Sequence, residues 1–330
     1  MRIANAPSAP TPTLTTGRPW QPARARRGTQ TWKAIRRDWR LYAMLALPAL
    51  YIIVFKYWPM YGIQIAFRNF NPIDGISGSP WVGLAHFERF VTSYSFRQVI
   101  GNTLLLSAYS LAAGFPLPII LALALNYTGR AWFRRTVQMT GYAPFFISMV
   151  VMVGIILVML DPRFGPINQF LGLFGFGPVD FMGNAGYFRH VYVWSGVWQY
   201  VGFSCIIYLA ALTSVDPTLH EAAIIDGANK LQRIRDIDLP TIMPVAVVLL
   251  ILEMGAVLSV GFEKALLLQN PINLPVSEVI DTYVYHVGLA GQLPQFSYAA
   301  AIGLFQSVIA MILIVAVNQI AKKVSGASLW

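Results

Sequence analysis

Six long apolar segments constrain this chain more than any other feature of its sequence. Each has roughly the 20 apolar residues that a helix needs to cross the hydrocarbon core of a bilayer. Hydrophobic residues make up 56% of the 330 residues and charged residues only 12%, too few to cover a soluble protein of this length. The sequence therefore predicts an all-α membrane protein with six transmembrane helices and excludes a cytosolic enzyme. The segments are residues 41–66, 100–125, 136–160, 190–213, 241–262 and 298–321.

The positive charge of the chain is concentrated at its N-terminal end. Nine of the 24 Lys and Arg residues lie in residues 1–40, where only Asp38 opposes them. Placing this end in the cytoplasm puts 17 of the 24 on the cytoplasmic side, as the positive-inside rule requires. We therefore predict two cytoplasmic termini, a basic and largely disordered tail over residues 1–40, and a six-span domain over residues 41–330. A nucleic-acid-binding arm is the weaker alternative for the tail, and we expect no nucleic-acid partner.

The sequence carries no recognisable catalytic or metal-binding motif. Its single cysteine, Cys205, lies within an apolar segment and cannot form an intrachain disulfide. The four histidines are scattered and lack the spacing of metal ligands. No GxxxxGK[ST] motif occurs. We therefore expect no catalytic residue, no metal site, no P-loop and no cofactor on this chain.

The connection between the fourth and fifth apolar segments has an informative pattern. Asp216-Pro217 is typical of the start of a helix, and Asp226-Gly227 predicts a turn. A second short helix is expected over residues 228–237, ended by Leu239-Pro240 before the fifth segment. Such a helix–glycine–helix knob could dock into a groove on a soluble partner. An ordinary amphipathic connector on the membrane surface is the alternative.

This connection, residues 215–240, resembles the EAA loop of ABC-importer permeases. The matching residues are Glu221-Ala222-Ala223, Asp226-Gly227-Ala228, Ile234, Ile237 and Leu239-Pro240. Residues 81–87 resemble an outer-loop pattern of carbohydrate permeases, with His86 where asparagine is usual. The C-terminal half is most similar to the polysaccharide or oligosaccharide "lipoprotein" permease group. It shares Gly261-Phe262-Glu263, Asn270-Pro271, residues 281–285 and Gly303-Leu304-Phe305 with that group.

The resemblance implies a fold, a location and a set of partners. The fold would be the type I ABC-importer architecture, similar to the maltose permease, in the inner membrane of a bacterium. The partners would be a second, homologous permease subunit in a heterodimer, two ATPase subunits that bind ATP and Mg, and a periplasmic or lipid-anchored solute-binding protein. The solute would be an oligosaccharide that crosses by alternating access, with uronate-containing pieces of alginate or pectin as one option.

The resemblance also assigns roles in coupling to the ATPase. Glu221 would pair with a basic group of the ATPase, Ala222 and Ala223 would allow close approach, and Gly227 would give the bend between the two helices. For each residue an ordinary structural role is the alternative: a solvated carboxylate, two helix formers and a helix C-cap. The other expected coupling residues are Asp226, Ile234, Ile237, Leu239 and Pro240.

The resemblance to maltose-type permeases implies that the sugar path uses the apolar segments on either side of this loop. Sugars are held by aromatic faces and hydrogen-bonding groups in an otherwise apolar pocket, and a carboxylate at bilayer depth marks an interior cavity or partner. Trp194 could instead be an interfacial residue, Trp198 and Gln199 helix-packing groups, and Glu253 a structural residue. Glu253 would repel an anionic sugar unless it is paired or protonated. The candidates are Trp194, Trp198, Gln199, Tyr200, Glu253 and Ser259.

Two other function classes compete with the importer permease. An ion-coupled secondary transporter would require inverted repeats and several carboxylates at mid-membrane depth, but only Glu253 is present and no repeat is visible. A membrane-embedded enzyme would require catalytic residues gathered at one depth.

Overall fold

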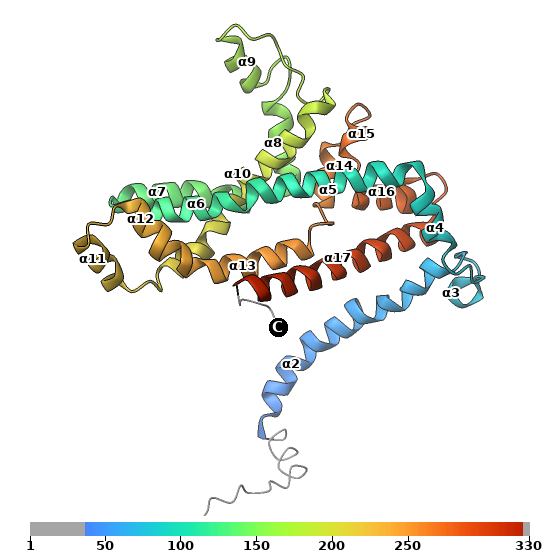
Figure 1. Cartoon of the computed structure of the whole chain (residues 1–330). Coiled ribbons are helices and arrows are strands. Elements are labelled where there is room, and N and C mark those ends of the chain that lie inside the picture. The colour runs from blue at the N-terminus through green and yellow to red at the C-terminus, as the bar shows by residue number, and fades with distance from the viewer. Residues whose placement is uncertain (1–36, 326–330) are drawn as a thin grey trace, which may run out of the picture. The chain divides into compact units, whose positions relative to one another are not determined.

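The computed structural model describes residues 37–325, and every regular element within them is a helix (Figure 1). Among these residues the only extended pairing is an isolated bridge between Arg68 and Trp81. The predicted all-α class is confirmed. Residues 1–36 of the predicted tail lie outside the described residues. The chain divides into two compact units between Tyr61 and Gly62.

The first unit holds the first predicted span. α2 (Trp39–Ile52) continues into a π-helical turn, η1 (Ile53–Tyr57), and then into the 3-10 helix η2 (Trp58–Phe67), whose last residues belong to the second unit. The combined helix, Trp39–Phe67, is long and apolar enough to cross a membrane, in agreement with the predicted segment 41–66. No residue of α2 is buried.

The second unit contains four more continuous helices that could cross a membrane. They overlap the predicted segments 100–125, 190–213, 241–262 and 298–321. In chain order they are α5 with α6 (Tyr94–Gly114, Pro116–Asn126), α10 (Ala185–Leu212), α12 to α13 (Lys230–Gly255) and α17 (Phe296–Ser325).

The third predicted segment, 136–160, is not one straight helix. α7 (Ala131–Tyr142) and the 3-10 turn η3 (Ala143–Phe146) are followed by α8 (Met149–Met159) at an angle of 105°. Pro144 lies in the turn, and the hydroxyl of Ser148 accepts a hydrogen bond from the Val151 amide to cap α8. The described residues thus contain five candidate spans, or six if this bent pair counts as one.

The predicted boundaries of the fifth span are wrong at both ends. We expected Leu239-Pro240 to end a separate helix, yet α12 (Lys230–Arg233), the π turn η4 (Ile234–Asp238) and α13 (Leu239–Gly255) run on without a break. A proline removes one backbone donor and crowds the carbonyl four residues earlier. The carbonyl four residues before Pro240 belongs to Asp236, inside the wider π turn, so the helix accommodates the proline.

The far end of this helix also differs from the prediction. α13 ends at Gly255 and not near residue 262, so Glu253 lies close to a helix end and not near the middle of a span. Residues 256–261 form an irregular break, in which Gly261 has the left-handed φ of +87° that favours glycine. A short helix, α14 (Phe262–Leu268), follows the break.

Short helices fill the connections between the spans. α14 packs against α8, α10 and α16, and α16 packs against α5 and α17. The remaining ones are α3 (Gly75–Gly78), α4 (Ala85–Thr92), α9 (Pro166–Gly172), α11 (Pro217–Ile225), α15 (Leu274–Ser277), α16 (Ile280–Tyr285) and the π turn η5 (His286–Ala290).

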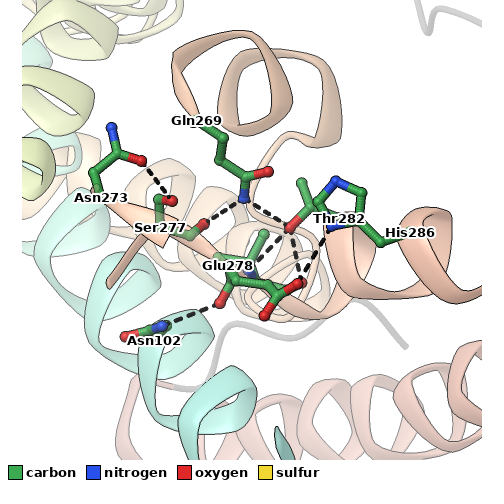
Figure 2. A network of polar contacts seen from close by, with 8 residues as sticks. Asn102, Gln269, Asn273, Ser277, Glu278, Thr282 and His286 are labelled. Atoms are coloured by element: carbon green, nitrogen blue, oxygen red, sulfur yellow. Dashed lines mark hydrogen bonds and ion pairs between the residues drawn. The ribbon is translucent and has the colours of Figure 1, made fainter. Parts of the chain in front are cut away.

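A buried polar network fixes the segment after α14 to α5 (Figure 2). The side-chain amide of Asn102 in α5 donates to the carbonyls of Pro275 (2.9 Å) and Glu278 (3.1 Å). The amide of Gln269 donates to the Ser277 carbonyl (2.9 Å) and to the Thr282 hydroxyl (3.0 Å). Because buried polar groups are costly unless they are paired, this network specifies one position for the segment.

α10 is the central helix of the second unit and contacts α5, α6, α7 and α13. Where it crosses α7, a Cβ atom on Gly202 would lie only 2.1 Å from the Gly141 carbonyl oxygen. The crossing therefore depends on glycine at this position, as in other close helix contacts of membrane proteins.

Candidate functional site

The predicted coupling loop, residues 215–240, has the expected local structure around Gly227. The carboxylate of Asp216 accepts a hydrogen bond from the Thr218 amide (2.9 Å) and caps α11, with Pro217 in its first turn. Gly227 has a φ of +81°, a conformation that L side chains rarely adopt. Asn229 and Gln232 then form a reciprocal capping box that starts α12. The bend is therefore fixed by local backbone chemistry.

The surface of this loop combines a carboxylate with exposed apolar side chains. Glu221, Ala222 and Asp226 are exposed, and Ala223 is half-buried. Ile225 is 85% exposed, and Ile224 and Leu231 are each more than half exposed. Large apolar side chains exposed on so short a loop suit a protein contact surface. Of the other predicted coupling residues, Ile234, Ile237 and Leu239 are half-buried and Pro240 is exposed.

Sequence analysis missed a polar clasp behind the loop, made of Tyr127, His220, Arg233 and Asp238. Asp238 is fully buried, and the Tyr127 hydroxyl donates to its Oδ2 atom (2.6 Å). His220 Nε2 lies 3.3 Å from Asp238 Oδ1, although outside hydrogen-bond geometry, and the Arg233 guanidinium lies 5.5 Å from the Tyr127 ring centroid. Burial, followed by the bond to Asp238, raises the pKa of Tyr127 to about 12, so the hydroxyl stays protonated at physiological pH. The clasp joins the end of α6 to both helices of the coupling loop.

A cavity of about 530 Å³ lies among α5, α6, α10, α13 and α14. Its wall is largely apolar, with a few polar groups at separate positions, as is common in sites for small ligands. The polar side chains that line it are Ser110, Tyr192, Tyr200, Ser204, Tyr208, Glu253 and Lys264.

Only two of the six predicted sugar-path residues, Tyr200 and Glu253, line this cavity. Trp194 is about half exposed, and its Nε1 atom donates to the Tyr109 hydroxyl (2.9 Å). Trp198 is also about half exposed. Gln199 is buried, and its amide donates to the Ile147 carbonyl (3.1 Å) at the bend between α7 and α8. The structure thus gives Gln199 a packing contact, and a sugar contact for either tryptophan stays a prediction.

Ser259 lines a second cavity, next to Asp281, Gln306 and Ser307. Its hydroxyl lies 3.4 Å from Asp281 Oδ2, and the Gln306 amide donates to Oδ1 of the same carboxylate (2.8 Å). The two candidates from span five, Glu253 and Ser259, therefore line different cavities.

Lys264 is a charged cavity residue that sequence analysis missed. Only 4% of this residue is exposed, and burial lowers the pKa of its ammonium to about 7. Its Nζ atom donates to the Tyr192 carbonyl (2.6 Å) and lies 4.5 Å from the centroid of the same tyrosine ring. The signal in the sequence was a lysine three residues after Gly261, next to the apolar residues 265–268. A charge at the edge of an apolar segment indicates a possible functional group.

Comparison with known proteins points to one family. The family described as "Binding-protein-dependent transport system inner membrane component" matches residues 114–326. The polygalacturonan/rhamnogalacturonan transport system permease protein YteP of Bacillus subtilis is 46% identical over 86% of this chain and 88% of its own length. Protein LplB of the same organism is 39% identical over 91% of this chain and 93% of its own.

Solved structures give the same result at the level of the fold. A chain of a bacterial ABC transporter involved in the import of the acidic polysaccharide alginate has a TM-score of 0.83 and 39% identity, covering 90% of this chain and 99% of its own. A second structure is the bacterial alginate ABC transporter in complex with an alginate pentasaccharide-bound periplasmic protein. Its matching chain has the same TM-score and coverage at 38% identity.

Proposed function

The chain belongs to the family of binding-protein-dependent transport system inner membrane components, and from this premise we propose that it is a permease subunit of an ATP-driven importer for uronate-containing oligosaccharides. It is a multi-pass protein of the bacterial inner membrane, with five or six candidate spans in its described residues. Family membership favours this function over an ion-coupled secondary transporter.

The observation that carries the proposal is the coupling loop. It presents Glu221 and an exposed apolar surface on two short helices, and its second helix continues directly into span five. A partner that moves the knob would move this span as a rigid body. Two cytoplasmic ATPase subunits are the partners that this arrangement suits. On this reading both termini of the chain are cytoplasmic.

The substrate class is inferred from the relatives and from the cavity. One relative is named for polygalacturonan and rhamnogalacturonan transport, and a solved relative imports alginate, an acidic polysaccharide. The cavity in this chain contains both a carboxylate and an ammonium group, Glu253 and Lys264. An oligosaccharide that carries carboxylates and hydroxyls fits such a wall better than a purely neutral sugar.

Other subunits complete the proposed transporter. A second, homologous permease would form the pore with this chain, and a solute-binding protein outside the membrane would deliver the sugar. ATP and Mg would be bound on the ATPase subunits and ATP hydrolysed there, so this chain would carry no cofactor and catalyse no reaction. The alginate transporter captured with its periplasmic binding protein supports this arrangement.

Reconstitution of the whole complex in liposomes tests the proposal. We expect the chain to copurify with a second permease and an ATPase, and uptake of short oligogalacturonates to require both ATP and the binding protein. Uptake that is driven by a proton or sodium gradient without ATP would contradict the proposal and support the alternative, an ion-coupled secondary transporter.

A further inference from the structure

The cavity contains a buried lysine that coupling to an ATPase does not explain. Lys264 lies in α14, a helix outside the coupling loop, and only 4% of it is exposed. Gly196 in α10 lies beside the Lys264 ammonium group. A Cβ atom added to Gly196 would lie 3.1 Å from Lys264 Nζ, the one neighbouring atom that it would approach within 4 Å outside its own helix. The glycine therefore leaves room for the ammonium group beside the cavity.

The contacts of Lys264 satisfy only part of what an ammonium group requires. It has three N–H donors, and one of them bonds the Tyr192 carbonyl while the Tyr192 ring lies beside the group. Within residues 37–325 no carboxylate lies close enough to form an ion pair with it. A buried charge without a counter-charge is costly. A negatively charged group that enters the cavity would offset this cost.

The complementary group also lines this cavity. Glu253, close to the end of α13, is exposed and forms no ion pair within the described part of the chain. A carboxylate is a strong acceptor for hydroxyl donors. Tyr200 and Ser204 add an aromatic ring and a further hydroxyl. A uronate residue carries one carboxylate and several hydroxyls, so it matches a wall that has one cation and one anion.

We propose that Lys264 determines the specificity of this permease for acidic sugars, with its ammonium group binding the carboxylate of a uronate residue in the cavity while Glu253 accepts hydrogen bonds from sugar hydroxyls. This inference rests on the proposed function as an oligosaccharide permease. It also resolves the expected repulsion between Glu253 and an anionic sugar, because Lys264 supplies the opposite charge in the same cavity.

The test compares an acidic sugar and its neutral form in the complete reconstituted transporter. The probes are trigalacturonate and the same trisaccharide with its carboxylates methyl-esterified, each supplied at equal occupancy of the binding protein. Lys264→Met should lower trigalacturonate uptake about 10-fold or more, the size expected for one charge-assisted hydrogen bond, and should leave ester uptake within about twofold. Lys264→Arg should retain most of the preference for the acid.

Two further variants keep the test decisive. Lys322→Met removes an exposed lysine at the end of α17 and should leave the uptake of both sugars unchanged. Gly196→Ala keeps every charge but its methyl group, 3.1 Å from Nζ, would displace the ammonium group by a few tenths of an ångström. It should therefore lower trigalacturonate uptake more than ester uptake, by a smaller factor than Lys264→Met, and it provides a test even if Lys264→Met fails to assemble.

The outcomes separate the inference from the function on which it rests. Equal loss of both sugars in Lys264→Met and Gly196→Ala, or no loss of either, would overturn the role of Lys264 and leave the permease function intact. Failure of the wild-type complex to take up either sugar, although its ATPase responds to the loaded binding protein, would count against the proposed substrate class itself.

Discussion

At the scale of single residues, the clasp around Asp238 gives the coupling loop a fixed attachment to the membrane helices. A buried carboxylate is costly unless it is hydrogen-bonded, and the Tyr127 hydroxyl supplies the hydrogen bond to Oδ2 of the fully buried Asp238. Because this tyrosine follows α6 and the aspartate precedes α13, the bond joins two spans at the end where the coupling loop lies.

Removing the Tyr127 hydroxyl should loosen this attachment. We expect Tyr127→Phe to cost about 1–3 kcal/mol locally, because Asp238 Oδ2 would lose its donor while remaining buried. The reconstituted complex should then hydrolyse more ATP for each sugar imported, and the loop should be cleaved faster by protease. Tyr94→Phe, at a residue that is 91% exposed, is the matched control. An unchanged ratio of ATP to sugar in Tyr127→Phe would show that the clasp has no part in coupling.

The residues that sequence analysis missed could not be predicted for one physical reason: their partners lie far away in the chain. Lys264 and its carbonyl partner Tyr192 are 72 positions apart, and Tyr127 and Asp238 are 111 apart. No local pattern encodes such pairs, because they form only when the helices pack. Asp216, Gly227 and Asn229 act on their own neighbours in the chain, so the turn and helix start could be predicted from the sequence.

At the scale of elements, π turns allow two helices to continue through a proline. η1 ends two residues before Pro59, and η4 ends two residues before Pro240. In both, the crowded carbonyl four residues before the proline lies inside the turn. The segment 41–66, predicted with Pro59 inside it, agrees with the structure, whereas reading Pro240 as a stop signal is wrong because the backbone widens there and continues. The apolar content of the spans was sufficient to locate them, whereas the 105° bend between α7 and α8 depends on packing.

The bend at Gly227 offers a graded test of the coupling element. Nothing in the described part of this chain lies within 4 Å of an added Cβ atom there, so within the chain a substitution acts through the backbone. Gly227→Asn should couple better than Gly227→Ala, which bears a strain of about 1–2 kcal/mol, and Gly227→Pro should hydrolyse ATP without transport. The measurement is uptake per ATP hydrolysed in proteoliposomes.

The matched control for this series is Gly129→Ala, since Gly129 has equally open surroundings and no positive φ. Wild-type coupling in Gly227→Pro, with insertion unimpaired, would remove the loop from the coupling mechanism.

At the scale of the whole molecule, the orientation in the membrane can be tested directly. Cys205 is buried and is the only cysteine of the chain, so Cys205→Ser gives a background without thiols. We expect Ile225→Cys in this background to react with an impermeant maleimide only from the cytoplasmic side, and Ile73→Cys only from outside. Both side chains are at least 85% exposed. The reverse pattern would place the coupling loop where no ATPase can reach it.

The unbroken helix from Lys230 to Gly255 makes the molecule a lever. Its first turn belongs to the loop of residues 215–240, and its last turn carries Glu253. At 1.5 Å per residue, Lys230 and Glu253 are about 35 Å apart along the helix. Lys264 lies in α14, after the irregular residues 256–261. The segment that follows α14 is hydrogen-bonded to Asn102 in α5. In the proposed mechanism, a movement of the loop would tilt the helix end that carries Glu253, while the segment after α14 is held to α5 by the Asn102 hydrogen bonds. The same movement that opens a route for the sugar would also draw apart the two charges that grip it.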